Sequence, residues 1–181
     1  NNKGSVREET RQRILKVMTE MGYRRNESAR ALASSQSRLV GVLTPRFVEW
    51  GPATTLLSLQ LAANEAGYFV SVATLAEFTT ETIRKSIDDL ISLGCAGIIV
   101  ISPVEPLARE LGKLEIPVPT LVVASRWIDD GSHHTRIGID QRSGVVEALR
   151  HLSSLGCQTI AHIAGPANDF DAMERDAAWR D

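Results

Sequence analysis

From residue 39 onward, short apolar runs alternate with segments whose apolar residues recur at helical spacing. The runs predicted as strands are 39–43, 69–75, 97–101, 120–124, 137–139 and 159–164. The helices predicted between them are 54–66, 80–93, 106–114 and 143–155, and a further helix begins after a loop at 165–172. This regular alternation predicts an α/β fold, a doubly wound parallel sheet with helices on both faces.

The first 38 residues have a different pattern. Residues 7–21 are predicted as a helix that Gly22 ends, with one apolar stripe formed by Ile14, Val17, Met18 and Met21. A second, short helix is predicted at 27–33, with Asn26 as its N-cap and Leu32 as its one large apolar residue. A helix of this length is marginal alone in water, and a polar linker follows it at 34–37.

The charge is divided between the same two regions. Residues 1–38 hold nine Lys or Arg and four Asp or Glu, which gives +5. Because the whole chain has a net charge of −2, the remainder carries −7. A basic head on an acidic body indicates an anionic partner for the head only.

The two cysteines, Cys95 and Cys157, each follow a Leu-Gly pair. Glycine at Gly67, Gly94 and Gly156 is predicted to end three helices, so both cysteines are expected to be buried, reduced and close to a strand start. No apolar run reaches the roughly 18 residues of a membrane span. These features favour a cytoplasmic protein. No leader peptide is visible, although the first residues have the character of an internal segment.

Ligands of open parallel sheets bind where strands end, so the loop after residue 43 is a candidate site. Phe47 and Trp50 in this loop could form an apolar wall for a ligand or could simply cover the sheet edge. Neither a dinucleotide or P-loop glycine motif nor a nucleophile elbow occurs, which argues against an enzyme. His133 and His134 are adjacent and point apart, and His151 and His162 lack ligands at metal spacing, so no metal or cofactor is expected.

Arg175 is the most informative charged residue near the end of the chain. It is expected near a helix N-terminus, where a cation does not stabilise the helix. Pairing with Asp171, Glu174 or Asp176 is one explanation, and a fork that grips a ligand is the other.

Three motifs carry a resemblance to a known family. They are Thr10-Arg11-x-Arg13-Ile14, then Met21-Gly22-Tyr23-Arg24-Arg25-Asn26-x-x-Ala29-Arg30-x-Leu32-Ala33, then Leu39-Val40-Gly41-Val42-Leu43. The segments Ile139-Asp140, Ala148-x-x-His151-Leu152-x-x-x-Gly156, Ile160-Ala161-His162-Ile163-Ala164-Gly165 and Arg175 continue it over the whole chain. In these residues the chain is similar to the lactose/galactose-repressor (LacI/GalR) family of transcriptional regulators.

The resemblance implies a periplasmic-binding-protein-like core behind a DNA-binding remnant. Residues 1–25 would be the end of a helix-turn-helix domain and 26–38 a hinge helix and linker. Residues 39–140 would be the N-terminal effector-binding subdomain, and 141–181 the start of a truncated C-terminal one. The implied partners are double-stranded operator DNA, a second copy in a homodimer or a tetramer, and a small effector such as a sugar, a nucleobase or a small acid.

The resemblance also assigns roles to single residues of the arm. Leu32 would wedge into the minor groove with Ala29 against the groove floor, a device that kinks DNA. Thr10 and Asn26 would contact phosphates, and Arg30 with Arg38 would add attraction that weakens with salt.

The effector site departs from the family pattern. Arg175 keeps the position of the effector-gripping arginine. In sugar-binding members of the family, a polar residue is common after the third strand, where this chain has Ile101 or Ser102. An Asp is common at the end of the fourth strand, where this chain has Ala124. The family also commonly has Asp-Asn where Asp140-Gln141 stands. We therefore expect a pocket, with a standard hexose the less convincing ligand. A solute-binding protein or an enzyme of the same fold are the alternatives, and the basic arm argues against the first.

Overall fold

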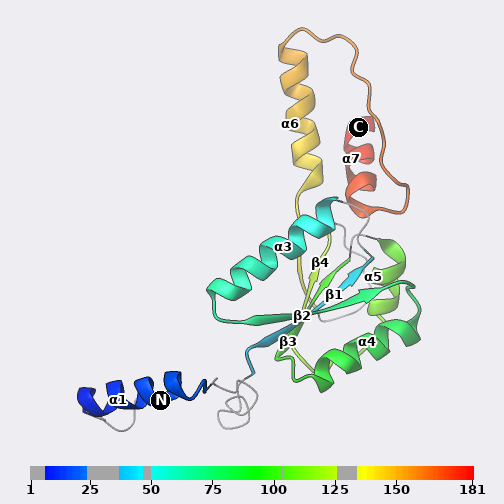
Figure 1. Cartoon of the computed structure of the whole chain (residues 1–181). Helices are drawn as coiled ribbons and strands as arrows, with labels where there is room; N and C mark the ends of the chain where they lie inside the picture. The colour runs from blue at the N-terminus through cyan, green and yellow to red at the C-terminus, as the bar shows by residue number, and fades with distance from the viewer. Residues whose placement is uncertain (1–6, 24–36, 47–49, 103, 126–133) are drawn as a thin grey trace. The chain divides into compact units, whose positions relative to one another are not determined.

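The structure is a computed structural model of the 181-residue chain and describes residues 7–23, 37–46, 50–102, 104–125 and 134–181. The chain forms two compact units, Asn1–Gln36 and Ser37–Asp181. Figure 1 traces the elements of both units along the chain.

The first unit contains helix α1 (Glu8–Glu20), close to the predicted bounds. Gly22 follows it in the left-handed region at φ +61°, as its predicted role in ending the helix requires. No residue of α1 is buried, and Met21, just beyond the helix, is 78% exposed. The predicted hinge at 27–33, with Asn26, Ala29, Arg30 and Leu32, lies outside the described residues.

The second unit is built on a sheet of five parallel strands. They are β1 (Leu39–Pro45), β2 (Phe69–Leu75), β3 (Gly97–Ile101), β4 (Thr120–Val123) and β5 (Thr135–Ile137). Their order is β2-β1-β3-β4-β5, and every neighbouring pair is parallel. The α/β fold predicted from the alternating pattern is confirmed.

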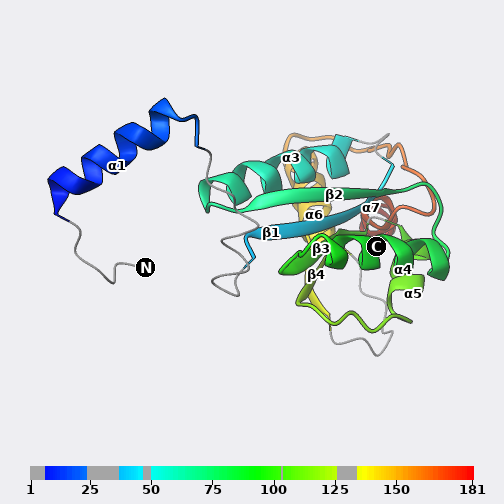
Figure 2. The ribbon, with the colours of Figure 1, turned by 60° about the horizontal axis from the view of Figure 1, so that its bottom comes forward.

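Helices cover both faces of this sheet. Figure 2 shows α3 (Trp50–Glu65) on one face and α4 (Thr80–Ser92) with α5 (Glu105–Leu111) on the other. The core lies on the α4 and α5 side, where the apolar side chains of strands and helices are removed from water. Its fully or nearly fully buried members include Leu43, Leu75, Ile83, Leu90, Ile98, Val100, Leu107 and Phe170.

Two further helices, α6 (Gln141–Ser154) and α7 (Phe170–Arg180), pack against each other, as Figure 1 shows. The strand predicted at 159–164 is wrong: these residues form neither strand nor helix. A strand needs a neighbour to accept its backbone hydrogen bonds. No described strand pairs with this segment, and Ile163 is 95% exposed.

The prediction that both cysteines are buried is correct for only one of them. Cys95 is buried and Cys157 is exposed, and both are free. Burial raises the pKa of the Cys95 thiol. Cys157 is exposed because the segment after it does not join the sheet.

One helix boundary differs in a way that affects the candidate site. Helix α3 begins at Trp50 instead of residue 54, so half of the predicted loop is helical. Pro52 then lies in the first turn, where the missing N–H has no intrahelical partner to lose. Within the described residues, no helix has the length and apolar character needed to cross a membrane.

Candidate functional site

The strand order places a topological switch point between β1 and β3. The chain leaves β1 toward α3 on one face and leaves the adjacent β3 toward α5 on the other. In open parallel sheets, ligands bind at the carboxyl ends of strands where such a switch occurs. The carboxyl ends of β1 and β3 are therefore the place to look for binding groups.

Two buried hydroxyl groups lie at these strand ends. Thr44 is near the end of β1 and Ser102 directly follows β3, and both are 0% exposed. Among the described residues, neither hydroxyl oxygen has a hydrogen-bond partner. Leaving such a group unpaired in the interior costs about 1–3 kcal/mol. Polar groups held at this cost at a switch point are candidates for contacts with a ligand.

Ser102 was predicted from the sequence as a site residue, and Thr44 was not. The available signal was one hydroxyl residue near the end of an otherwise apolar strand. Ile101 and Ala124 are where the sequence analysis placed them, at the ends of β3 and β4, but they are 3% and 7% exposed. They can contribute only apolar contact to a ligand.

The chain beyond β5 passes very close to the end of β4. The Ala124 amide donates to the Ile137 carbonyl at 2.9 Å. A Cβ at Gly138 would lie 2.1 Å from the Ala124 carbonyl oxygen, so only glycine fits there. After this close approach the chain continues to Asp140 and Gln141, the N-cap and the first residue of α6.

Helix α7 is anchored at the same edge of the sheet. Asp169 caps it by accepting a hydrogen bond from the Ala172 amide at 2.7 Å. Asp169 also forms an isolated antiparallel bridge with Val104, two residues beyond Ser102. Phe170, 1% exposed, belongs to the core cluster. The first turn of α7 is thus fixed beside the end of β3.

Arg175 extends from α7 to the start of α6. Its Nη1 donates to Oε1 of Gln141 at 2.9 Å, and the side chain is half-buried. None of the ion pairs among the described residues includes Arg175, so pairing with Asp171 or Asp176 is not observed there. The sequence analysis noted Gln141 only as a departure from the family, and the contact with Arg175 was missed.

Three acidic residues of α6 and α7 and their ends have other partners. Asp140 accepts hydrogen bonds from the amide and hydroxyl of Ser143, which lower the pKa of its carboxyl. Asp176 accepts from Arg180 Nε at 2.8 Å, which lowers the pKa of Asp176. Asp181 pairs with Arg142.

His162 takes a structural role in the same region, as expected. Its ring stacks on Trp179 with centroids 5.5 Å apart. Its Nε2 lies 3.9 Å from Oδ1 of Asp176. These contacts hold the segment after α6 against α7.

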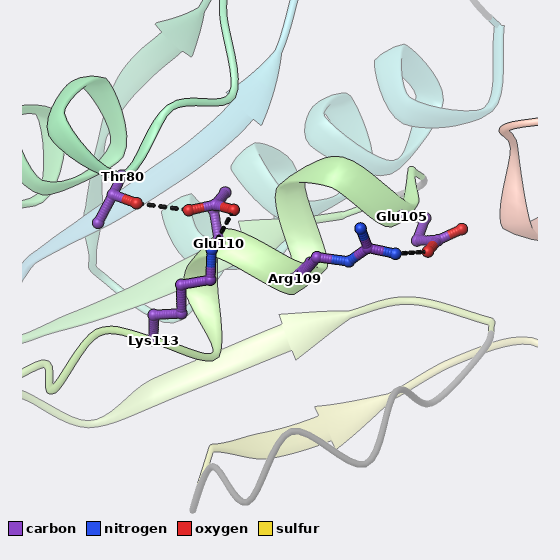
Figure 3. A network of polar contacts seen from close by, with 5 residues as sticks. All are labelled: Thr80, Glu105, Arg109, Glu110 and Lys113. Carbon is purple, nitrogen blue, oxygen red and sulfur yellow. Dashed lines mark hydrogen bonds and ion pairs between the residues drawn. The ribbon is translucent and has the colours of Figure 1, made fainter.

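A polar network joins α4 to α5 (Figure 3). Thr80 donates to the Glu110 carboxylate, which also pairs with Lys113, while Arg109 pairs with Glu105. The Lys113 and Thr80 hydrogen bonds lower the pKa of Glu110. Both cations drawn there have carboxylate partners, so the network stabilises the helices and offers no free binding charge.

An open hollow of about 950 Å³ lies at the opposite, amino edge of the sheet. Its lining is mostly apolar, with residues 112–116 and 118–121 on one side and Val40 and Ile98 on another. Lys113 on its rim is the lysine that pairs with Glu110. The lining also includes His134 and Thr135.

Three other residues were predicted from the sequence to contact the effector or DNA. Phe47 lies outside the described residues, and Trp50 begins α3. Thr10 lies on α1 and is exposed.

Comparison with known proteins covers both units of the chain. The lactose operon repressor of Escherichia coli is 27% identical over 182 residues, 99% of this chain and 49% of that protein. The HTH-type transcriptional regulator GalS of Salmonella typhimurium is 29% identical over 177 residues, 97% of this chain and 51% of that protein. The chain thus spans about half the length of the curated relatives it matches. No family model matches the chain.

Solved structures agree with the sequence relatives. The lac repressor bound to ONPG in the repressed state has a TM-score of 0.79 at 26% identity, covering 99% of this chain and 54% of that one. The lac repressor dimer bound to operator and the anti-inducer ONPF has a TM-score of 0.78 at 26% identity, covering 98% and 53%. Over nearly its whole length, the chain is therefore similar in sequence to repressors of the lactose/galactose (LacI/GalR) kind and, in fold, to the lac repressor.

Proposed function

We propose that this chain is the coupling part of a sequence-specific, DNA-binding transcriptional repressor of the cytoplasm, whose operator affinity a small effector controls. The observation that carries the proposal is homology to repressors across the arm and the sheet together. Under this proposal residues 1–25 end the helix-turn-helix domain and 26–38 form the hinge. Residues 39–140 and 141–181 contribute to the two effector-binding subdomains.

The composition of the arm supports contact with DNA. Its net charge of +5 is suited to phosphates, and α1 presents Thr10 and basic residues to solvent. We propose that Thr10, Asn26 and Arg30 contact the backbone. Ala29 and Leu32 enter the minor groove, where an apolar wedge unstacks a base step.

The carboxyl edge of the sheet supports effector binding. Arg175, Ser102 and the newly identified Thr44 are polar groups at or beside the switch point. Ile101, Ala124, Phe47 and Trp50 supply apolar contact in this proposal. An effector acts by binding one arrangement of the two subdomains more tightly, which changes how the hinges meet the operator.

Exposed apolar residues support a homodimer. Leu57 and Leu61, one turn apart on α3, are each 57% exposed. Phe69 and Val72 on the edge strand β2 are 55% and 37% exposed. A neighbouring set of exposed apolar side chains is typical of a surface that another protein covers.

Selection from random double-stranded DNA with the whole protein tests the proposal. We expect enrichment of one palindromic sequence, because a two-fold dimer reads two half-sites. Affinity for it should fall linearly with the logarithm of salt concentration, as phosphate contacts release counterions. Recovery of random sequences alone would contradict DNA recognition, and a single non-repeated half-site would contradict the dimer.

A further inference from the structure

Helix α7 is attached to the sheet unit by its first turn. Phe170, the first residue of α7, is 1% exposed and belongs to the same core cluster as Leu43 of β1 and Leu107 of α5. Met173, in the same turn, also packs against this cluster. The core beside the sheet therefore includes an aromatic side chain that arrives from a helix beyond α6.

The backbone beside Phe170 is tied to the sheet unit at one defined point. Asp169 forms an isolated antiparallel bridge with Val104, the N-cap residue of α5. The Asp169 carboxylate caps α7 through the Ala172 amide, and its carbonyl accepts from the Met173 amide at 2.9 Å. The bridge and the cap together place Phe170 at the entrance to the core.

The rest of the α6–α7 pair contributes little apolar surface to the core. No residue of α6 is buried, and the other buried residues of α7 are the small Ala172 and Ala178. The hydrogen bond from Arg175 to Gln141 joins the two helices to each other. Phe170 is therefore the one large side chain of the pair that is completely removed from water.

The strength of this attachment is suited to regulation. Burial of one phenylalanine side chain favours a docked over an undocked arrangement by about 10- to 100-fold. Coupling between two sites of a regulated protein has a similar size, about 5- to 150-fold. A partner that binds the undocked arrangement better can therefore shift this equilibrium.

We propose that Phe170 is a latch. Its burial docks the α6–α7 pair on the sheet unit, and its withdrawal lets the pair move. Gly138 lies so close to the Ala124 carbonyl that the chain before α6 is fixed there, so the movement begins at Ile139 and Asp140. This inference names a moving part of the proposed regulation and rests on the proposed function for its effect on operator binding.

Hydrogen exchange followed by mass spectrometry tests the latch in the whole protein, without DNA or effector. In Phe170→Ala, peptides from 166–181 should exchange about 10- to 100-fold faster, because an undocked helix of 11 residues is marginal alone in water. Peptides from β1 and β3 should exchange as in the parent protein. Phe170→Leu, which keeps an apolar side chain, should have a smaller effect in the same direction.

Phe78→Ala is the matched control. Phe78 lies before α4 and is partly buried against the same core cluster. Its truncation should accelerate exchange in peptides of α4 and leave peptides from 166–181 unchanged. The comparison separates a latch on α7 from a general loosening of the core.

Unchanged exchange of 166–181 in Phe170→Ala would overturn the latch. Equal acceleration of β1 and β3, or loss of the folded protein, would also overturn it, because Phe170 would then be part of one cooperative core. Operator affinity without effector should change by about threefold or more in Phe170→Ala and not in Phe78→Ala. Unchanged affinity would overturn the regulatory role. Failure of the parent protein to select any operator would contradict the proposed function and leave the exchange result standing.

Discussion

The two units of this chain treat their apolar residues in opposite ways. In the sheet unit, Leu43, Ile83 and Val100 are completely buried in a core that strands and helices build together. In α1, Ile14, Leu15 and Val17 are between 44% and 52% exposed, and no residue of the helix is buried. The sheet unit makes its own core, whereas the stripe of α1 needs a covering partner.

The same contrast appears in charge and in chemistry. The arm is basic, and the charged side chains of its described residues 7–23 are exposed, which suits a long anionic partner. The sheet unit lies in the acidic part. Several of its carboxylates cap helices or form ion pairs, and Arg175 contacts the neutral amide of Gln141. The arm is therefore suited to attract an anionic partner by its surface charge. The sheet unit is suited to select a ligand through a few polar groups at defined positions.

The largest expected effect concerns the core of the sheet unit. Leu90 and Leu93 lie one turn apart at the end of α4, with exposures of 2% and 63%. Leu90→Ala should lower the free energy of unfolding by about 2–5 kcal/mol, since it leaves a cavity. Leu93→Ala should change it by about 0.5 kcal/mol or less. Urea unfolding of the sheet unit measures both, and equal effects would contradict the assigned core.

A second prediction concerns the arm. Leu32→Ala should weaken operator affinity by about tenfold or more and reduce DNA bending, because the wedge that unstacks a base step is lost. Arg30→Ala should weaken affinity and reduce its salt dependence. Fluorescence anisotropy and a bending assay on the selected operator measure the effects. Unchanged affinity and bending in Leu32→Ala would remove it from the groove.

A smaller effect is expected at the cap of α7. Asp169→Ala removes the acceptor for the Ala172 amide and should cost about 1 kcal/mol of unfolding free energy. Asp169→Asn should recover most of this loss, because the amide oxygen can still accept. If both variants unfolded like the parent protein, the cap would contribute nothing to stability.

The smallest effect is a dependence on pH at α6. Hydrogen bonds from Ser143 lower the pKa of Asp140. Its stabilising contribution is therefore full above the ordinary pKa and is lost as the pH falls through the lowered value. The melting temperature of the parent protein should exceed that of Asp140→Asn near pH 6, and the difference should shrink toward pH 3. A difference that grows on acidification would contradict this sign.

Much of the fold was predictable because local signals agree with it. The strands at 69–75 and 97–101 have the predicted bounds, and glycines at 22, 67, 94 and 156 all adopt positive φ. The prediction of a strand at residues 159–164 failed because a strand depends on a neighbouring strand as well as on its own sequence. The pattern of Ile160 and Ile163 suits a strand that no described segment pairs with.

The site was predictable only in part. Ser102 could be named from its position after a strand, because parallel strands end at one edge. Arg175 could be named from its expected place near the start of a helix. The contact between Arg175 and Gln141 joins residues 34 positions apart, and sequence spacing does not encode it. Thr44 escaped notice because the sequence does not reveal that its hydroxyl lacks a partner.

The coupling of the two units is tested most directly by operator affinity measured with and without a bound probe, chosen as a sugar, nucleobase or small acid that raises the melting temperature of the whole protein. In the parent protein, saturating probe should change operator affinity by about 5- to 150-fold. In Arg175→Ala, affinity without probe should be retained, and the probe should have no effect. A probe that binds the parent protein without changing operator affinity, or that still changes it in Arg175→Ala, would contradict the account.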